Sequence, residues 1–341
     1  MDTPKSLLIY ESDAMKAIKE QVLSIVDMDC PILIRGETGV GKTDFASDIH
    51  SWSKRSNAKF IKMMCTYKSA ELFRNELFGH VKGAYTSADS TQEGKMKLAN
   101  NGTLFFDEIG DLPLETQADL LEVIGDQRRK KYITPVGSTE QFPVDVRIIA
   151  ATNVNLEKLI KEGKFREDLY YRFDSVIEIP PLRKRELDMY HIFDSMKSSL
   201  NIEFDKKVEY LSYDDEKRIF DLVREYKWPG NIRDFLRFLR AVFRNVSSNQ
   251  SYIFLYDVEK ALSEIKSKNL HLSEESSNVK TGRAFETTSL KDYIEEQERE
   301  YIKHALIKNQ WHCINTAKYL KISRNKLYRK VKYHKIEPTF F

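Results

Sequence analysis

The sequence has 341 residues, of which 41% are hydrophobic and 31% charged, so the chain is long enough for two or three compact units with buried cores. Its longest apolar stretches, residues 146–151 and 176–182, are far shorter than the roughly 20 residues that a membrane-spanning helix needs. Asp2 and Lys5 interrupt any signal-like N-terminus. We therefore expect a cytoplasmic protein with no membrane partner.

The cysteines and the distribution of charge narrow the class further. Three scattered cysteines are too few for a disulfide framework or a zinc site, and we expect them to be buried thiols: Cys30, Cys65 and Cys313. The net charge is +3, yet residues 311–341 contain eight lysines and arginines against one glutamate. That segment carries +7 and the rest of the chain −4. This asymmetry suggests a polyanionic partner for the C-terminus, although a basic run is also typical of a solvated face.

Between residues 31 and 180, short β-rich apolar runs alternate with helical patterns. The runs lie at residues 31–35, 59–64, 103–107, 146–152 and 175–179. This alternation is typical of α/β proteins and predicts a parallel sheet in a first domain, residues 1–180.

After residue 181 the strand pattern disappears, and apolar residues recur at helical spacing. Two such sets are Ile219, Leu222, Val223 and Phe235, Phe238, Leu239, Val242. We therefore expect a helical subdomain over residues 181–266. Residues 267–288 are polar and lack periodicity, which predicts a linker, and a small all-α domain should follow at residues 289–341.

A phosphate-binding loop follows the first predicted strand. Residues 36–43 fit the pattern G-x-x-x-x-G-K-[ST] and precede a helical pattern: Gly36, Glu37, Thr38, Gly39, Val40, Gly41, Lys42 and Thr43. Glycines let the backbone N–H groups converge on phosphate oxygens, while Lys42 adds positive charge and the Thr43 hydroxyl can ligate Mg²⁺. The pattern predicts ATP and Mg²⁺ as cofactors, the alternative being a chance glycine-rich turn.

Polar residues end two further predicted strands. Asp107 and Glu108 follow an apolar strand, and we expect Asp107 to hold the metal and Glu108 to polarise the attacking water. By itself an acidic pair at a strand end is usually a solvated turn. Asn153, after another strand, could sense the γ-phosphate or position water, although asparagine is also a common turn residue.

The last helices have the pattern of a helix-turn-helix. A helical pattern from Leu290 to about Asn309 precedes residues 314–320, a short turn, and a basic helix for which Ser323 is a suitable N-cap. The residues expected to face inward are Ala317, Leu320, Ile322, Leu327 and Val331. Those expected to project toward double-stranded DNA are Arg324, Lys326, Arg329 and Lys330. A basic hairpin that does not enter the groove is the alternative.

Seven ordered sequence blocks give the chain a family resemblance. They are GETGVGKT, ELFGHVKGAYTSA, NGTLFFDEI, VDVRIIAATN, FREDLYYRF, PPLRKR and WPGNIRDF. Across residues 7–245 the chain resembles the NtrC-like sigma-54 activators, and its C-terminus is similar to their Fis-type helix-turn-helix. The resemblance implies an AAA+ ATPase with a helical lid that forms a homo-oligomer, a hexamer on activation. It also implies sigma-54 RNA polymerase holoenzyme and upstream DNA sites as partners.

The resemblance also assigns roles to residues that the pattern alone does not mark. Arg166 and Arg172 match the arginine-finger positions, and Arg233 matches the sensor II arginine. Residues 83–88 match the GAFTGA loop that touches sigma-54: Gly83, Ala84, Tyr85, Thr86, Ser87 and Ala88. Because the resemblance begins almost at Met1, we expect control by a separate regulatory protein, by the amount of protein made, or no control at all.

Three departures from the family keep rival functions open. Tyr85 and Ser87 replace Phe and Gly in the loop, and Met64 stands where an Asn usually restrains the catalytic glutamate. A methionine cannot make that hydrogen bond, so Glu108 should be freer. The first rival is an AAA+ DNA-binding regulator, activator or repressor, that no longer engages sigma-54. An AAA+ unfoldase is a second, which the predicted DNA-binding end disfavours.

Overall fold

The computed structural model describes most of the chain in two compact units, Met1–Ile265 and Lys266–Phe341. The described residues are 8–66, 69–85, 88–125, 131–208, 213–247, 252–274, 302, 305–306, 311–320, 322–334 and 336. Within these ranges, no helix combines the length and the apolar character needed to cross a membrane.

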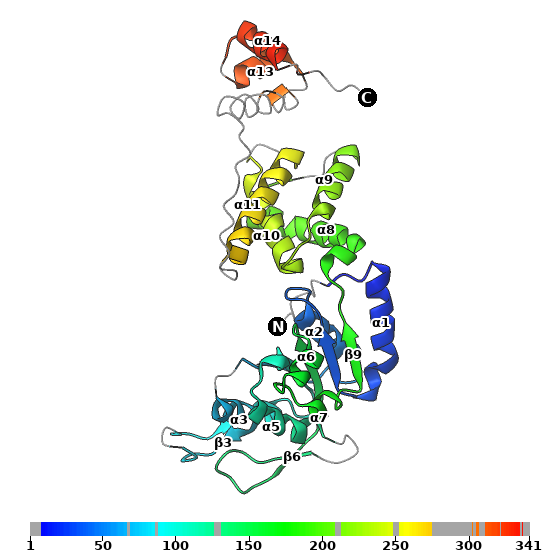
Figure 1. The fold of residues 1–341 in the computed structure, drawn as a ribbon, viewed down its shortest axis with the longest axis vertical. Helices are drawn as coiled ribbons and strands as arrows, with labels where there is room; N and C mark the ends of the chain where they lie inside the picture. The colour runs from blue at the N-terminus through cyan, green and yellow to red at the C-terminus, as the bar shows by residue number, and fades with distance from the viewer. Residues whose placement is uncertain are drawn as a thin grey trace. The chain divides into compact units, whose positions relative to one another are not determined.

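A parallel five-stranded sheet forms the centre of the first unit (Figure 1). Its strands lie in the order β2 (Phe60–Met64), β5 (Thr103–Asp107), β8 (Arg147–Thr152), β1 (Ile32–Arg35) and β9 (Ser175–Glu178). Every neighbouring pair is parallel. All five predicted strands are present, and the predicted α/β class is confirmed.

Successive residues of the strands enter two separate apolar cores, because side chains alternate between the faces of a sheet. Ile32 and Ile34 pack with α1 (Asp13–Ile25) and α2 (Lys42–Trp52) on one face. Leu33 packs on the other face with α3 (Ala70–Phe78) and α5 (Leu114–Ile124). Since both faces are covered, the strands are nearly continuous hydrophobic runs, as expected of a parallel sheet.

Shorter elements complete the α/β part. They are η1 (Val26–Met28), α4 (Lys95–Leu98), η2 (Ile109–Asp111), α6 (Leu156–Lys161) and α7 (Glu167–Tyr170). Two antiparallel strand pairs lie outside the main sheet: β3 (Gly79–His80) with β4 (Gln92–Glu93), and β6 (Lys131–Ile133) with β7 (Phe142–Val144). The backbones of the two pairs are linked, because Val81 N–H donates to Val136 O and Val136 N–H donates to Gly79 O.

A helical part follows, made of η3 (Leu182–Lys184), α8 (Glu186–Glu203), α9 (Tyr213–Glu225), α10 (Asn231–Asn245) and α11 (Leu255–Glu274). Its core is continuous with that of the α1 and α2 face of the sheet. Trp228 is fully buried there, and its indole N–H donates to Val223 O at 3.0 Å. Helix α11 runs on to Glu274 and so includes the first eight residues of the segment predicted as a linker. Residues 267–274 contain no glycine or proline to end the helix.

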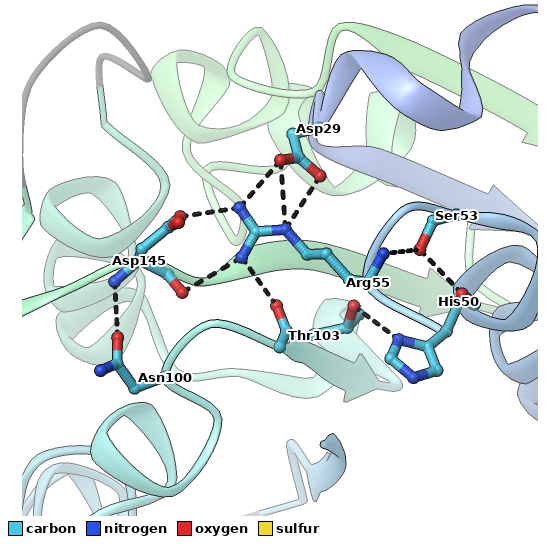
Figure 2. Close-up of polar contacts among 8 residues, drawn as sticks. Asp29, His50, Ser53, Arg55, Asn100, Thr103 and Asp145 are labelled. Carbon is cyan, nitrogen blue, oxygen red and sulfur yellow. Dashed lines mark hydrogen bonds and ion pairs between the residues drawn. The ribbon is translucent and has the colours of Figure 1, made fainter. Parts of the chain in front are cut away.

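A polar network lies at the amino ends of the strands, the edge opposite the predicted nucleotide site (Figure 2). The Arg55 guanidinium donates to Asp29 at 2.8 Å, to Asp145 Oδ1 at 2.7 Å and to the carbonyl oxygen of Gly102 at 3.3 Å. It thereby joins the segments that lead into β1, β5 and β8. Nearby, His50 of α2 hydrogen-bonds Thr103 at 2.9 Å. These contacts fix the register of α2 against the sheet.

The second unit contains α13 (Cys313–Tyr319) and α14 (Arg324–Tyr333) around a small apolar core. Both predicted helices of the helix-turn-helix are present. Most of the predicted helix from 290 to 309 lies outside the described residues. Within that segment, Ile302 is 3% exposed and packs with Leu306 and Leu327 of the same unit.

Candidate functional site

The phosphate-binding loop joins β1 to α2 at the carboxyl edge of the sheet. Gly39 and Gly41 have φ angles of 79° and 100°, which residues other than glycine rarely adopt. A Cβ on Gly39 would also lie 2.2 Å from the carbonyl oxygen of Gly230. The Lys42 ammonium lies over the loop, donating to Gly36 O at 3.1 Å, and its side chain is 6% exposed. The loop is therefore shaped to receive phosphate oxygens on its backbone N–H groups and on this cation.

Thr43 and Asp107 bring two oxygen ligands together beside this loop. Asp107 ends β5, which lies two strands from β1, and the Thr43 hydroxyl donates to Asp107 Oδ2 at 3.1 Å. Oxygens on adjacent positions of an octahedral Mg²⁺ ion, each about 2.1 Å from the metal, lie about 3 Å apart. The hydroxyl and the carboxylate therefore fit the predicted magnesium ion in both chemistry and spacing.

Glu108 and Asn153 lie next to each other although 45 residues separate them. The Asn153 backbone N–H donates to Glu108 Oε2 at 3.0 Å, and Glu108 Oε1 lies 3.5 Å from Lys42 Nζ. The Asn153 side-chain amide donates to Thr38 Oγ1 at 2.9 Å. Glu108 has the left-handed backbone conformation, with φ 58°, a strained geometry often found at functional sites. Met64 makes no such bond, so Asn153 and Lys42 restrain the glutamate in this chain.

The helical part contacts the phosphate-binding loop through the start of α10. Ile232 N–H donates to Gly39 O at 2.9 Å, and the buried Asn231 amide donates to Thr38 O at 3.0 Å and to Glu37 Oε2 at 3.1 Å. Arg233 follows them; it is exposed, with its Cβ beside Gly39. The α10 start therefore places an arginine next to the loop.

A second link joins the loop to η3. The Arg183 guanidinium donates to Glu37 through two bonds, at 2.6 and 2.9 Å. This pairing, with the Asn231 amide, lowers the pKa of Glu37 to about 2. The pKa of Glu37 is lower in the folded protein than in the unfolded chain, so the ion pair stabilises the fold at pH values above the ordinary pKa of a glutamate. This stabilisation is lost as the pH falls from that value toward about 2.

The two candidate arginine fingers lie on the surface around α7. Arg166, the N-cap residue of α7, is exposed and its guanidinium pairs with Asp168 at 2.7 Å. Arg172, just after the helix, is also exposed. Within the described residues, neither guanidinium bonds to the phosphate-binding loop. Both guanidinium groups therefore lie at the surface, that of Arg166 held by Asp168.

The segment that matches the GAFTGA loop extends from β3. Gly83 N–H donates to Ala88 O at 2.9 Å and Ala88 N–H donates to Tyr85 O at 3.0 Å, so the two ends of the loop meet. The Tyr85 ring lies 5.1 Å from the ring of His80, centroid to centroid. Thr86 and Ser87 lie outside the described residues.

The basic helix α14 has the predicted arrangement. Ser323 caps it, its hydroxyl accepting from Lys326 N–H at 3.3 Å. Leu327 is fully buried and Ala317 is 4% exposed, as predicted for inward-facing residues. Arg324, Lys326 and Arg329 are exposed, whereas Lys330 is half-buried. The exposed three are the better candidates for contacts with DNA.

Comparison with known proteins gives the family. Residues 8–179 match the sigma-54 interaction domain and residues 293–333 match the bacterial regulatory protein Fis family. The chain belongs to the sigma-54 interaction domain family. Its C-terminal region is a Fis-family helix-turn-helix.

Relatives and solved structures agree with this family. The chain is 41% identical over 249 residues to a signal-transduction and transcriptional-control protein of Clostridium beijerinckii, spanning 72% of this chain but 38% of the relative's length. It is 34% identical to the regulatory protein AtoC of Escherichia coli, covering 97% of this chain and 68% of that protein. The structure of NtrX from Brucella abortus with ADP superposes with a TM-score of 0.64 at 25% identity, over 96% of this chain and 70% of that one.

Several site residues escaped the sequence interpretation. Asn231 and Arg183 lie in the WPGNIR and PPLRKR blocks, yet their partners are in the phosphate-binding loop. Leu8 and Ile232 flank Gly41, with Leu8 Cδ2 2.7 Å from where a Cβ would lie. Lys62 contacts Asp107. Only the fold reveals these contacts, because no local pattern links these residues to the phosphate-binding loop or to Asp107.

Proposed function

We propose that this chain hydrolyses ATP in a ring of identical subunits, a hexamer when active, and uses the energy to remodel sigma-54 RNA polymerase at promoters. The observation that carries the proposal is the convergence of Lys42, Thr43, Asp107 and Glu108 at one edge of the sheet in a sigma-54 interaction domain. Sequence similarity alone supports the family, whereas this convergence supports turnover of a nucleotide.

The residues of one subunit divide the chemistry of hydrolysis. The loop N–H groups and Lys42 bind the β- and γ-phosphates. Thr43 and Asp107 would hold Mg²⁺, which supplies positive charge to the phosphate oxygens when bound. Glu108, which accepts from the Asn153 N–H, would orient and polarise the attacking water. The Asn153 side-chain amide, which donates to Thr38, would sense the γ-phosphate or help to position this water.

Arginines complete the site from two directions. We propose that Arg233 reaches the nucleotide from the helical lid of the same subunit, since its Cβ lies beside Gly39. Arg166 and Arg172 lie exposed around α7 and would act on the nucleotide of a neighbouring subunit. A guanidinium supplied in this way stabilises the charge that develops on the γ-phosphate, and it makes turnover depend on assembly.

Two further parts connect hydrolysis to transcription. The loop of residues 83–88 would contact sigma-54, and the hydrogen bonds that link its base to the β6–β7 pair would transmit a movement between them. Helix α14 would bind double-stranded DNA upstream of the promoter through Arg324, Lys326 and Arg329, with Ser323 and Lys330 at its margins.

Open-complex formation tests this function directly. Full-length protein, sigma-54 holoenzyme, ATP and a supercoiled target promoter should give single-stranded DNA at the start site, detected by permanganate reactivity. Lys42→Ala should give none. If the wild-type protein hydrolyses ATP and binds upstream DNA but never opens the promoter, the chain is instead a regulator that no longer engages sigma-54. Ser87→Gly, which restores the family residue, would then be the variant to examine for regained opening.

A further inference from the structure

Lys62 lies in the nucleotide site although it belongs to none of the motifs that define the site. It is the third residue of β2, the strand that pairs with β5. Its ammonium lies 2.6 Å from Asp107 Oδ2 and 3.2 Å from the Thr43 hydroxyl oxygen. It also lies 5.8 Å from the centroid of the Phe105 ring. The lysine side chain is 40% exposed, whereas that of Asp107 is 10% exposed.

The two oxygens that Lys62 contacts are the two that fit a magnesium ion. A lysine ammonium is a compact cation with three donors, so it can bridge a carboxylate and a hydroxyl as a metal does. Its contacts of 2.6 and 3.2 Å occupy the space between these oxygens. A metal ion bound by both oxygens would compete with the ammonium for the same lone pairs and would be repelled by its charge. Lysine and metal therefore compete for these two oxygens.

We propose that Lys62 is a built-in cation that holds the magnesium position until the metal binds with nucleotide. Its ammonium neutralises the nearly buried Asp107 carboxylate and bonds both this carboxylate and the Thr43 hydroxyl oxygen. The two oxygens are thereby kept close together before the metal binds. The lysine must then leave the position, which its exposed, flexible side chain allows. Lys62 should consequently weaken metal binding, and it should lessen the dependence of nucleotide affinity on the metal. The inference rests on the proposed function for Mg²⁺ and nucleotide.

The proposal predicts opposite effects of one substitution in the absence and the presence of metal. In EDTA, Lys62→Met leaves the Asp107 charge uncompensated near the phosphates, so ADP should bind more weakly than to the wild type. With metal, the competitor is gone, and Mn²⁺ should bind the ADP complex about fivefold more tightly, the size expected for a partly exposed ion pair. A purely structural lysine would shift both affinities in the same direction.

The test uses full-length protein and two measurements that need no turnover. Fluorescence of a labelled ADP gives its dissociation constant in EDTA and in saturating Mg²⁺, and paramagnetic resonance of free Mn²⁺ gives the metal affinity of the ADP complex. Lys62→Arg keeps the charge and should resemble the wild type. Lys54→Met is the matched control, because Lys54 forms an exposed pair with Asp27 at 3.9 Å, outside the site. Lys62→Gln replaces the methionine variant if the latter does not fold.

Each result decides between the alternatives. Tighter Mn²⁺ binding together with a larger ratio of ADP dissociation constants between EDTA and Mg²⁺ supports the proposal. Unchanged or weaker Mn²⁺ binding in folded Lys62→Met overturns it while leaving the proposed function intact. If the folded wild-type protein shows no metal-dependent nucleotide binding, both the inference and the proposed ATPase are overturned.

Discussion

Lys42 and Glu108 face each other across the nucleotide site, 3.5 Å apart, yet each contributes different chemistry. In the proposed function, the lysine contributes charge in the ground state, because it would bind phosphate oxygens whether or not reaction follows. The glutamate would act on water. Its carboxylate accepts from the Asn153 N–H, and its backbone has a strained left-handed conformation. The two side chains can therefore be separated experimentally, one by binding and the other by turnover.

Lys42→Ala should abolish nucleotide binding, whereas Glu108→Gln should keep binding and lose turnover by a factor on the order of 100 or more. Glutamine preserves the shape and the hydrogen bond from Asn153 but cannot serve as the base. Labelled-nucleotide binding and phosphate release measure the two properties, with circular dichroism as the control for folding. Wild-type hydrolysis by either variant would contradict this assignment of the site.

At the level of the elements, the start of α10 joins the helical lid to the phosphate-binding loop. The Asn231 side chain donates to Thr38 O and Glu37 and accepts from Leu182 N–H at 2.8 Å, so one amide links the loop, η3 and α10. The residue is fully buried. Polar groups left unpaired in such a place are costly, so this side chain should couple the lid to the loop.

Asn231→Ala should therefore lower the free energy of unfolding by about 2–3 kcal/mol and reduce the stabilisation that nucleotide gives. Thermal unfolding with and without ADP measures both effects. Asn245→Ala is a matched control at the other end of the same helix, where the amide bonds the partly exposed Glu264 at 3.2 Å. Equal effects of the two substitutions would show that Asn231 has no special role in the coupling.

At the scale of the whole molecule, the proposed function makes the exposed arginines around α7 part of a nucleotide site only when subunits assemble. Glu108→Gln and Arg172→Ala proteins, each inactive alone, should regain part of the ATPase activity when mixed, because one interface then contains an intact glutamate and an intact arginine. The same holds for Arg166→Ala. Measuring phosphate release across mixing ratios tests this. Mixtures that co-assemble but stay inactive would argue against action in trans.

The DNA-binding unit should be separable from the ATPase, because the chain divides into two compact units near residue 265. Deleting residues 289–341 should leave ATP hydrolysis largely unchanged and remove operator binding.

Within the DNA-binding unit, Arg324→Ala or Lys326→Ala should cost about 1–3 kcal/mol of sequence discrimination if the side chain reads a base edge. A phosphate contact would instead weaken binding to all DNA and reduce the salt slope by about one. Fluorescence anisotropy on operator and scrambled duplexes over a salt series distinguishes these outcomes, and a truncated protein that still binds the operator would contradict the helix-turn-helix assignment.

The sequence by itself determined the features that depend on neighbouring residues. Several features are each encoded within a few consecutive positions: the five strands, the phosphate-binding loop, the acidic end of β5 and the Ser323 cap. They could be predicted because side-chain alternation, glycine conformations and capping act locally. Composition alone did not show where α11 ends. The polar residues 267–274 suggested a linker, yet nothing in them prevents a helix that starts earlier from continuing, and α11 extends through them.

Only the tertiary structure decided which distant residues meet at the site. Asn231 contacts Thr38 across 193 residues, and Arg183 contacts Glu37 across 146. In the sequence, Lys62 resembles any solvent-exposed lysine of a strand. Only the pairing of β2 with β5 places it beside Asp107. Such contacts depend on the order of strands in the sheet and on how the lid packs against it. These arrangements follow from the packing of the entire apolar core, so no local pattern of residues reveals them.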